Sequence, residues 1–148
     1  MGSIPITRSI MMTANRESLV AAARESCQSS HAPYSGIHVG AAVRSAGGNV
    51  YRGTNVENAS YPLGNCAETS AIAAGVQAEG ARFRIAEIAV WATDGEGRVL
   101  PASPCGGCRQ RIHELAVDGG VNVHFPWQGG ETRSASIDEL LPFAFYLP

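Results

Sequence analysis

Three cysteines in two separate stretches constrain this chain more than any other feature of its sequence. Cys66 lies in "PLGNCAETSA" (62–71), and Cys105 and Cys108 lie in "SPCGGCRQ" (103–110). The two glycines inside the C-x-x-C pair let the backbone fold tightly, which leaves both sulfur atoms on one side. If the third cysteine acts with this pair, the fold must bring the two stretches together at one point.

Each stretch also carries residues that typically start a helix. Asn65 is a good N-cap for a helix that begins at Cys66. Ser103 followed by Pro104 is a cap followed by the favoured first-turn proline. Two helix N-termini aimed at one spot favour negative charge, and thiols ionise more easily near helix N-termini and metal ions. The pattern therefore predicts a metal site of three thiolates between two helix starts.

A C-x-x-C pair alone also occurs in structural zinc knuckles, iron–sulfur clusters and thiol redox proteins. A site with four thiolates would need Cys27, which lies in an expected amphipathic helix and is better interpreted as a core residue. His113 follows Cys108 by five residues and falls on the wrong helix face to close the site. The other histidines are more simply surface or core residues: His31, His38 and His124. Three protein ligands and an open position are the catalytic pattern of zinc.

Glu68, two residues after Cys66, has two interpretations. In the simpler one it is the N3 acid of a capping box that begins at Asn65. In the other, a carboxylate beside a metal-activated water takes its proton and delivers it to a leaving group. The neighbouring cysteines favour the second interpretation, so we predict that Glu68 is a general acid and base.

The composition is that of a single globular domain without a nucleic-acid surface. The chain has 148 residues, of which 45% are hydrophobic and 16% charged, with a formal net charge of −2 and no basic run. All 11 basic residues are arginines, which excludes lysine nucleophiles. The sequence has no secretory leader and no apolar stretch approaching the roughly 20 residues that span a bilayer. We expect a cytoplasmic protein with reduced thiols and neither nucleic-acid nor membrane partners.

The hydrophobic pattern predicts an α/β fold with a mixed central sheet. We expect residues 1–12 to be a disordered or extension segment and residues 13–148 to form one domain. Helices are expected over about 13–27, 66–80 and 104–117 and after Ser136, and strands over about 38–45, 49–56, 85–93, 121–126 and 130–135. The first two strands form a hairpin around "AGGN". Ser136 and Glu139 have the spacing of a capping box.

These motifs resemble those of the zinc-dependent cytidine deaminases, in particular their small homotetrameric class. C-A-E (66–68) followed by P-C-x-x-C (104–108) is similar to that family's signature, with cysteine in place of the histidine of the wider family. Three further stretches of this chain resemble motifs of the family: "APYSGIHVGAAV" (32–43), "GTNVENASYPLGNCAE" (53–68) and "ELLPFAF" (139–145). The resemblance covers nearly the whole chain from Ala14 and implies a three-layer α-β-α sandwich with a mixed five-stranded central sheet.

The resemblance implies hydrolytic deamination of cytidine and 2′-deoxycytidine to the corresponding uridines, with release of ammonia. One zinc ion per subunit would be bound by Cys66, Cys105 and Cys108. Zinc-bound hydroxide would attack C4 of the base while Glu68 shuttles the proton.

The resemblance also implies the substrate contacts. Asn55 and Glu57 hold the ribose, although loop and turn chemistry is an alternative role for both. The Ala67 N–H meets the 2-oxo group of the base, and the Ser103 carbonyl meets its 4-amino group. Phe145 stacks on the base in a neighbouring subunit, within a homotetramer whose active sites are shared.

Two positions depart from the family pattern. Thr69 stands where the family usually has an arginine that hydrogen-bonds the zinc thiolates. Three thiolates on Zn²⁺ leave a net charge of −1, so the missing positive charge must be supplied by another group, and Arg109 and the two helix dipoles are candidates. Ile37 stands where the family commonly has a phenylalanine that packs against the nucleoside, so aromatic stacking is lost.

Three other functions stay open, and only the first depends on these two departures. One is deamination of another aminated substrate, such as blasticidin S or a modified cytosine nucleoside. A second is a binding module with a structural zinc ion and no catalysis. A third is a thiol redox protein that uses Cys105 and Cys108.

Overall fold

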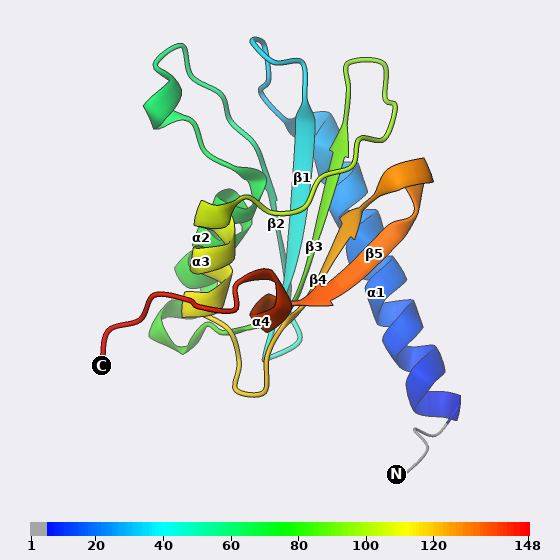
Figure 1. Cartoon of the computed structure of the whole chain (residues 1–148), viewed down its shortest axis with the longest axis vertical. Coiled ribbons are helices and arrows are strands. Elements are labelled where there is room, and N and C mark those ends of the chain that lie inside the picture. Colours follow the sequence, from blue (N-terminus) through cyan, green and yellow to red (C-terminus); the bar gives the residue numbers. More distant parts are fainter. Residues whose placement is uncertain (1–5) are drawn as a thin grey trace.

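The computed structural model of the chain describes residues 6–148. The helices and strands in this part of the chain are, in order, α1 (Ile6–Ser26), β1 (His38–Ser45), β2 (Val50–Thr54), α2 (Ala67–Glu79), β3 (Ile85–Thr93), α3 (Gly106–Glu114), β4 (Asn122–Pro126), β5 (Thr132–Ser136) and α4 (Ile137–Leu140). The described residues form a sheet of five strands with helices on both faces (Figure 1). This order of elements matches the order expected from the hydrophobic pattern.

The sheet has the strand order β2-β1-β3-β4-β5. Only β3 and β4 pair in parallel within the described residues, and α3 lies in the connection between them. The other neighbouring strands pair antiparallel, including the β1–β2 hairpin. The long helix α1 covers one face, and α2 and α3 lie on the other (Figure 1). The predicted three-layer α-β-α sandwich with a mixed sheet is therefore confirmed.

Strand β1 shows why the sheet is covered on both faces. Its residues alternate between the two faces, as the pleat requires. Ala42 packs in one buried cluster with Leu19 and Ala23 of α1. Ala41 and Val43 belong instead to the cluster beneath α2 and α3. An apolar run without polar alternation is thus the correct signal for a strand that is buried on both faces.

A glycine in β2 fixes how closely α2 lies on the sheet. A Cβ at Gly53 would stand 2.3 Å from the Ala71 nitrogen and 2.5 Å from the Ala67 oxygen. Both distances are far below van der Waals contact, so only glycine allows the first turns of α2 to touch the strand. The sheet therefore determines the position of Cys66 and Glu68 at the start of α2.

The N-terminal helix differs from the sequence prediction. It begins at Ile6 and not at Thr13. Residues 1–5, which belong to the segment expected to be disordered or an extension, lie outside the described residues. Ile10 and Met11 are mostly exposed, at 64% and 61% of their surface. The boundary at residue 12 between an extension and a domain stays a prediction. No helix within the described residues is long and apolar enough to cross a membrane.

Candidate active site

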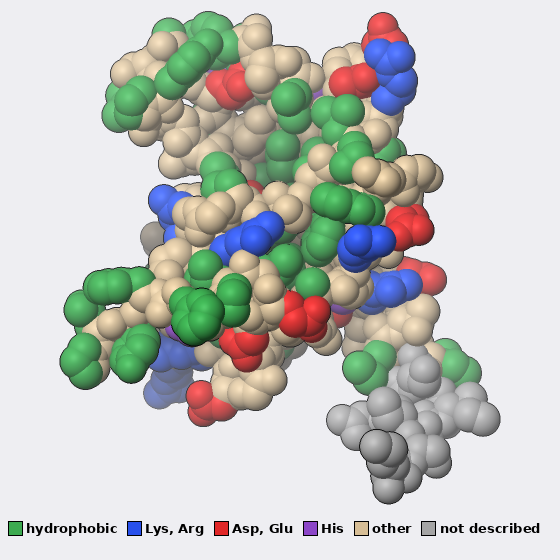
Figure 2. Space-filling view, in the orientation of Figure 1, with side chains coloured by type: hydrophobic (Ala, Val, Ile, Leu, Met, Phe, Trp, Pro, Cys, Tyr) green, Lys and Arg blue, Asp and Glu red, His purple; other side chains and the backbone are tan. Residues whose placement is uncertain are grey.

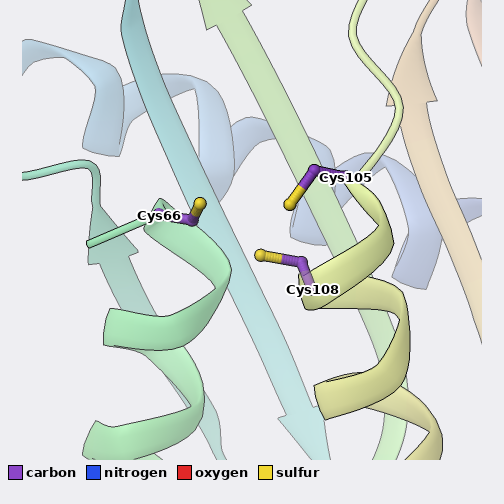
Figure 3. A group of neighbouring side chains, drawn as sticks. All are labelled: Cys66, Cys105 and Cys108. Carbon is purple, nitrogen blue, oxygen red and sulfur yellow. The ribbon is translucent and has the colours of Figure 1, made fainter. Parts of the chain in front are cut away.

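The three cysteines of the two sequence stretches lie together in the structure. The Sγ atoms of Cys66, Cys105 and Cys108 are all within 4.8 Å of one another. Figure 3 shows their sulfur atoms pointing into the space between the starts of α2 and α3. Tetrahedral zinc with Zn–S bonds of about 2.3 Å requires sulfur atoms about 3.8 Å apart, so a small contraction fits the ion. All three are free thiols, which leaves them available as ligands.

The helix starts differ in detail from those expected. Cys66 is itself the N-cap of α2, and Cys105 is the N-cap of α3. The predicted caps Asn65 and Ser103 are therefore wrong, and so is the predicted start of the third helix at Pro104. With Cys66 at the N-cap, the capping-box interpretation of Glu68 is also lost. Cys66 and Cys105 therefore stand at the helix ends that carry a partial positive charge, although neither side chain makes a capping hydrogen bond.

Cys66 forms hydrogen bonds with the other two thiols of the cluster. The hydrogen bond with the Cys108 thiol lowers the pKa of Cys66 to about 6, against the effect of burial. The Cys105 thiol and the positive charge of Arg111 also lower the pKa of Cys66. The same hydrogen bond, together with burial, raises the pKa of Cys108. One thiol therefore gives up its proton readily, and metal binding releases the others.

Glu68 lies beside this cluster and is almost completely buried, with 5% of its surface exposed. Burial raises the pKa of its carboxyl group, and the negative charge of Cys66 raises it as well. A hydrogen bond with Cys108 and the positive charge of Arg111 act in the opposite direction without cancelling the rise. A carboxyl group that holds its proton closer to neutral pH is suited to general acid and base catalysis.

A cavity of about 560 Å³ opens onto the cluster. Glu68, Cys66 and Cys105 line it. Five residues predicted to contact substrate also line it, namely Ile37, Asn55, Glu57, Ala67 and Ser103. Phe145 does not line this cavity and lies on the C-terminal tail with 69% of its surface exposed.

Asn55 and Glu57 are held in the cavity wall by backbone groups. The Asn55 side chain accepts from the Val39 N–H at 2.9 Å and donates to the Ile37 carbonyl at 2.9 Å. Glu57 Oε1 accepts from the N–H groups of Tyr34 and Ser35 at 2.9 and 3.1 Å. Hydrogen bonds from Ser35 and Tyr34 lower the pKa of Glu57, so this carboxylate stays charged. These contacts orient both side chains before any ligand binds.

Two aromatic residues of the cavity were missed by the sequence reasoning. Tyr34 and Tyr61 both line it, and their rings meet edge to face with centroids 6.2 Å apart. Both residues lie within motifs that had been singled out, at 32–43 and 53–68. Tyrosines in loop motifs beside predicted ligand-binding residues were the signal that could have identified them.

Arg109 and Arg111 act on different parts of the site. The Arg109 guanidinium donates to the carbonyls of Pro104 and Leu140 at 2.7 and 2.9 Å and to the Ser103 hydroxyl at 3.0 Å. It braces the loop before α3 against α4, and its predicted role toward zinc stays a prediction. Arg111 was not predicted, although it follows Cys108 by three residues and so shares its side of the helix. Its positive charge acts on both Cys66 and Glu68.

Known proteins match the chain along most of its length. The family described as the cytidine and deoxycytidylate deaminase zinc-binding region matches residues 13–123. A cytidine deaminase of Sporosarcina psychrophila is 36% identical over 129 residues, which cover 87% of this chain and 90% of that protein. A cytidine deaminase of Halalkalibacterium halodurans is 39% identical over 131 residues, which cover 88% of this chain and 94% of that protein.

Solved structures agree with the sequence relatives. The crystal structure of cytidine deaminase from Burkholderia pseudomallei matches with a TM-score of 0.75 and 39% identity, over 87% of this chain and 98% of that one. The crystal structure of cytidine deaminase from Mycobacterium tuberculosis matches with a TM-score of 0.70 and 34% identity, over 90% of this chain and 98% of that one. Because fold, cysteine cluster and sequence agree over most of its length, this protein belongs to the zinc-binding cytidine and deoxycytidylate deaminase family.

Proposed function

We propose that this protein hydrolyses cytidine and 2′-deoxycytidine to uridine and 2′-deoxyuridine and releases ammonia. The observation that carries the proposal is the buried Glu68 carboxyl group, which lines one cavity together with the clustered thiols of Cys66 and Cys105. The relatives named cytidine deaminase support the same reaction.

Cys66, Cys105 and Cys108 would hold one zinc ion through their sulfur atoms. Zinc bound there supplies Lewis acidity, which makes water a nucleophile near neutral pH. Three protein ligands leave one position open to water, as catalytic zinc sites require. Among the described residues, the cluster consists of these three cysteines and includes no histidine or carboxylate as a fourth ligand, which argues against a closed structural site.

Glu68 would move the protons of the reaction. Its raised pKa, caused first by burial, lets the carboxyl group carry a proton closer to neutral pH than an exposed glutamate does. Glu68 takes one proton from the attacking water and places it on N3 of the base. It then takes the second proton and delivers it to the amino group, which leaves as ammonia. One water is consumed, and its oxygen becomes the 4-oxo group of the product.

The cavity supports a free nucleoside as substrate. Its volume of about 560 Å³ falls within the range of small-molecule sites. The oriented side chains of Asn55 and Glu57 are suited to the ribose hydroxyls. Ala67 is the first residue of α2, so its N–H has no partner within the helix and is available to the 2-oxo group. The Ser103 carbonyl would accept from the 4-amino group.

The proposal includes a cytoplasmic homotetramer with shared active sites. Figure 2 shows apolar side chains gathered on the C-terminal tail at the lower left, and Phe143, Phe145 and Leu147 are exposed at 96%, 69% and 80%. The Gln110 side chain holds the Phe145 backbone at both its N–H and its carbonyl, which fixes the tail on the surface. This exposed tail is suited to docking in another subunit. Sedimentation at micromolar concentration tests this, and a monomer would contradict it.

Ile37 and Thr69 favour a second candidate, a deaminase that prefers another aminated substrate, because both depart from the family pattern. One experiment separates the candidates. The zinc-loaded protein and its Glu68→Ala variant are incubated with cytidine, 2′-deoxycytidine and blasticidin S, and the ultraviolet change and released ammonia are followed. Turnover of the two nucleosides by the wild type alone supports the proposal. Turnover of blasticidin S without cytidine supports the second candidate, and activity that survives zinc removal by a chelator rejects both.

A further inference from the structure

The expected zinc site of this chain has a net negative charge, and the arginine that usually balances this charge in the family is absent. Three thiolates and Zn²⁺ sum to −1, and a negative site is a weaker Lewis acid unless a nearby cation offsets the charge. Thr69 occupies the position after Glu68 where the family usually has an arginine. The Arg109 guanidinium donates to the Pro104 and Leu140 carbonyls and to the Ser103 hydroxyl.

Arg111 lies where such a cation is needed. It is on α3, one helical turn after Cys108, and its Nη1 lies beside Gly107 in the first turn of the helix. Arg111 Nη1 stands 2.9 Å from the point that a Cβ on Gly107 would occupy, and Cys105 Sγ stands 4.0 Å from the same point. The guanidinium and the thiol therefore flank one glycine, which leaves the room that a larger residue would fill. The charge of Arg111 also reaches Cys66 and Glu68 on the facing helix.

We propose that Arg111 supplies, from α3, the positive charge that the family usually places beside the zinc thiolates from α2. Arg111 is a positioning residue, because it acts through the thiolates and does not touch substrate. The inference rests on the zinc site of the proposed function and not on the choice of substrate. It also explains how Thr69 is tolerated, since the charge has moved from one helix to the other.

Zinc affinity tests this without any measurement of activity. The zinc dissociation constant is measured at pH 6 by competition with a chromogenic chelator. Zinc binding displaces the thiol protons, so the loaded site carries the net negative charge of three thiolates on Zn²⁺. Arg111→Gln should weaken zinc binding about tenfold, the lower end for groups that support metal ligands, because Arg111 is exposed. Arg111→Lys should stay within about twofold of wild type, and Arg111→Glu should lose about tenfold more than Arg111→Gln. High salt should narrow these differences.

A rescue variant sharpens the test. Adding Thr69→Arg to Arg111→Gln returns a cation to the α2 side and should restore most of the lost affinity. Arg82→Gln removes the same charge from an exposed arginine in the turn after α2 and should leave zinc affinity unchanged. Equal affinities for wild type, Arg111→Gln and Arg111→Glu would overturn the proposal, as would a loss in Arg111→Lys as large as in Arg111→Gln. A protein that fails to deaminate cytidine but shows this charge series refutes only the substrate assignment.

Discussion

Glu68 and Glu87 are two shielded carboxyl groups whose surroundings shift their pKa values in opposite directions. Burial raises the pKa of Glu68, and the negative charge of Cys66 adds to the rise. Burial also raises the pKa of Glu87, but the hydrogen bond and charge of His124 and the charge of Arg44 outweigh it, so the pKa of Glu87 lies below its usual value. The same residue type therefore has a raised pKa in one region and a lowered pKa in the other.

The region around Glu87 is a polar network that joins four strands. Glu87 on β3 pairs with Arg44 on β1. Its other oxygen lies 2.6 Å from His124 Nε2 on β4, and His124 Nδ1 lies 2.7 Å from the Ser134 hydroxyl on β5. His124 is 3% exposed, so its ring is a buried polar group with both nitrogens in contact. Such a fully satisfied network stabilises the arrangement of the strands.

Glu68 belongs to a region built for chemistry. The negative charge of the neighbouring Cys66 raises the pKa of Glu68, and the positive charge that opposes this rise comes from Arg111 on another helix. A buried carboxyl group in such surroundings costs stability and gains proton affinity. The comparison teaches that burial alone does not identify a catalytic acid, because what separates Glu68 from Glu87 is the balance between burial and the charges around each carboxyl group. Exchanging each carboxylate for its amide should therefore give opposite patterns of activity and stability.

The largest effect is expected from Glu68→Gln. The amide cannot take or deliver protons, so kcat/KM for cytidine should fall about 10³-fold. Burial disfavours the charged form of the Glu68 carboxyl group, so a neutral amide at this position should not lower the thermal midpoint of the zinc-loaded protein. Absorbance assays and calorimetry measure the two quantities. Zinc content, determined by metal analysis, should be unchanged and serves as the control. Activity within tenfold of wild type would contradict the assignment of Glu68 as the proton-transferring group.

Glu87→Gln should show the reverse pattern. The change removes a charged partner from both Arg44 and His124, so the free energy of unfolding in urea should fall by about 2 kcal/mol. Activity of the folded protein should remain within about twofold, because the network does not line the cysteine cavity. Glu96→Gln is the matched control, since Glu96 forms an exposed ion pair with Arg98 and should change stability by less than about 0.5 kcal/mol. A larger loss in the control would refute the assigned role of the network.

The pH dependence of stability gives the next effect. A carboxyl group whose pKa is lower in the folded state contributes stability above its unfolded pKa, and that stability is lost as the pH falls through the folded pKa. The lowered pKa of Glu87 therefore predicts a loss of stability as the pH falls below about 4. Urea unfolding at several pH values should show a shallower acid decline in Glu87→Gln than in wild type. Parallel curves would mean that other carboxylates control the acid limb.

The sequence was sufficient for the sheet, the helices and the cysteine cluster because these depend on local periodicity and on clear motif spacing. The strand boundaries in β1 and β3 agree with those expected, since Gly and turn residues end each apolar run. The starts of α2 and α3 were misplaced by one or two residues, because Asn65 and Ser103 have better capping propensity than cysteine. Tertiary geometry placed sulfur at the N-cap against this local preference.

The polar contacts could not be predicted, because they join residues far apart in the sequence. Nothing in the spacing of Arg44, Glu87 and His124 indicates that three strands bring them together. The position of Arg111 could have been predicted from helix geometry, since it lies one turn after Cys108, but the space that its guanidinium occupies also depends on the absence of a side chain at Gly107. Local pattern thus predicts elements and ligands, whereas charge balance around a site requires the assembled fold.

The smallest effect sharpens the comparison at the edge of the active-site cavity. Ile37 lines the cavity and is 42% exposed, so an aromatic ring can replace it without disturbing the core. Ile37→Phe should add stacking with the base worth about 0.5–1.5 kcal/mol and lower KM for cytidine by about two- to tenfold. Unfolding free energy should stay within about 0.5 kcal/mol, as it should in the control Val50→Phe.

Val50 is a suitable control because it has nearly the same exposure, 41%, and lies on β2 outside the cavity lining. A lower KM in both variants would indicate a general effect of added apolar surface and not a contact with substrate. An unchanged KM in Ile37→Phe would mean that Tyr34 and Tyr61 already provide the aromatic wall of this cavity. The departure at Ile37 would then be compensated within the site, as Arg111 compensates the departure at Thr69, and the active-site region would tolerate change wherever a neighbour supplies the same physical interaction.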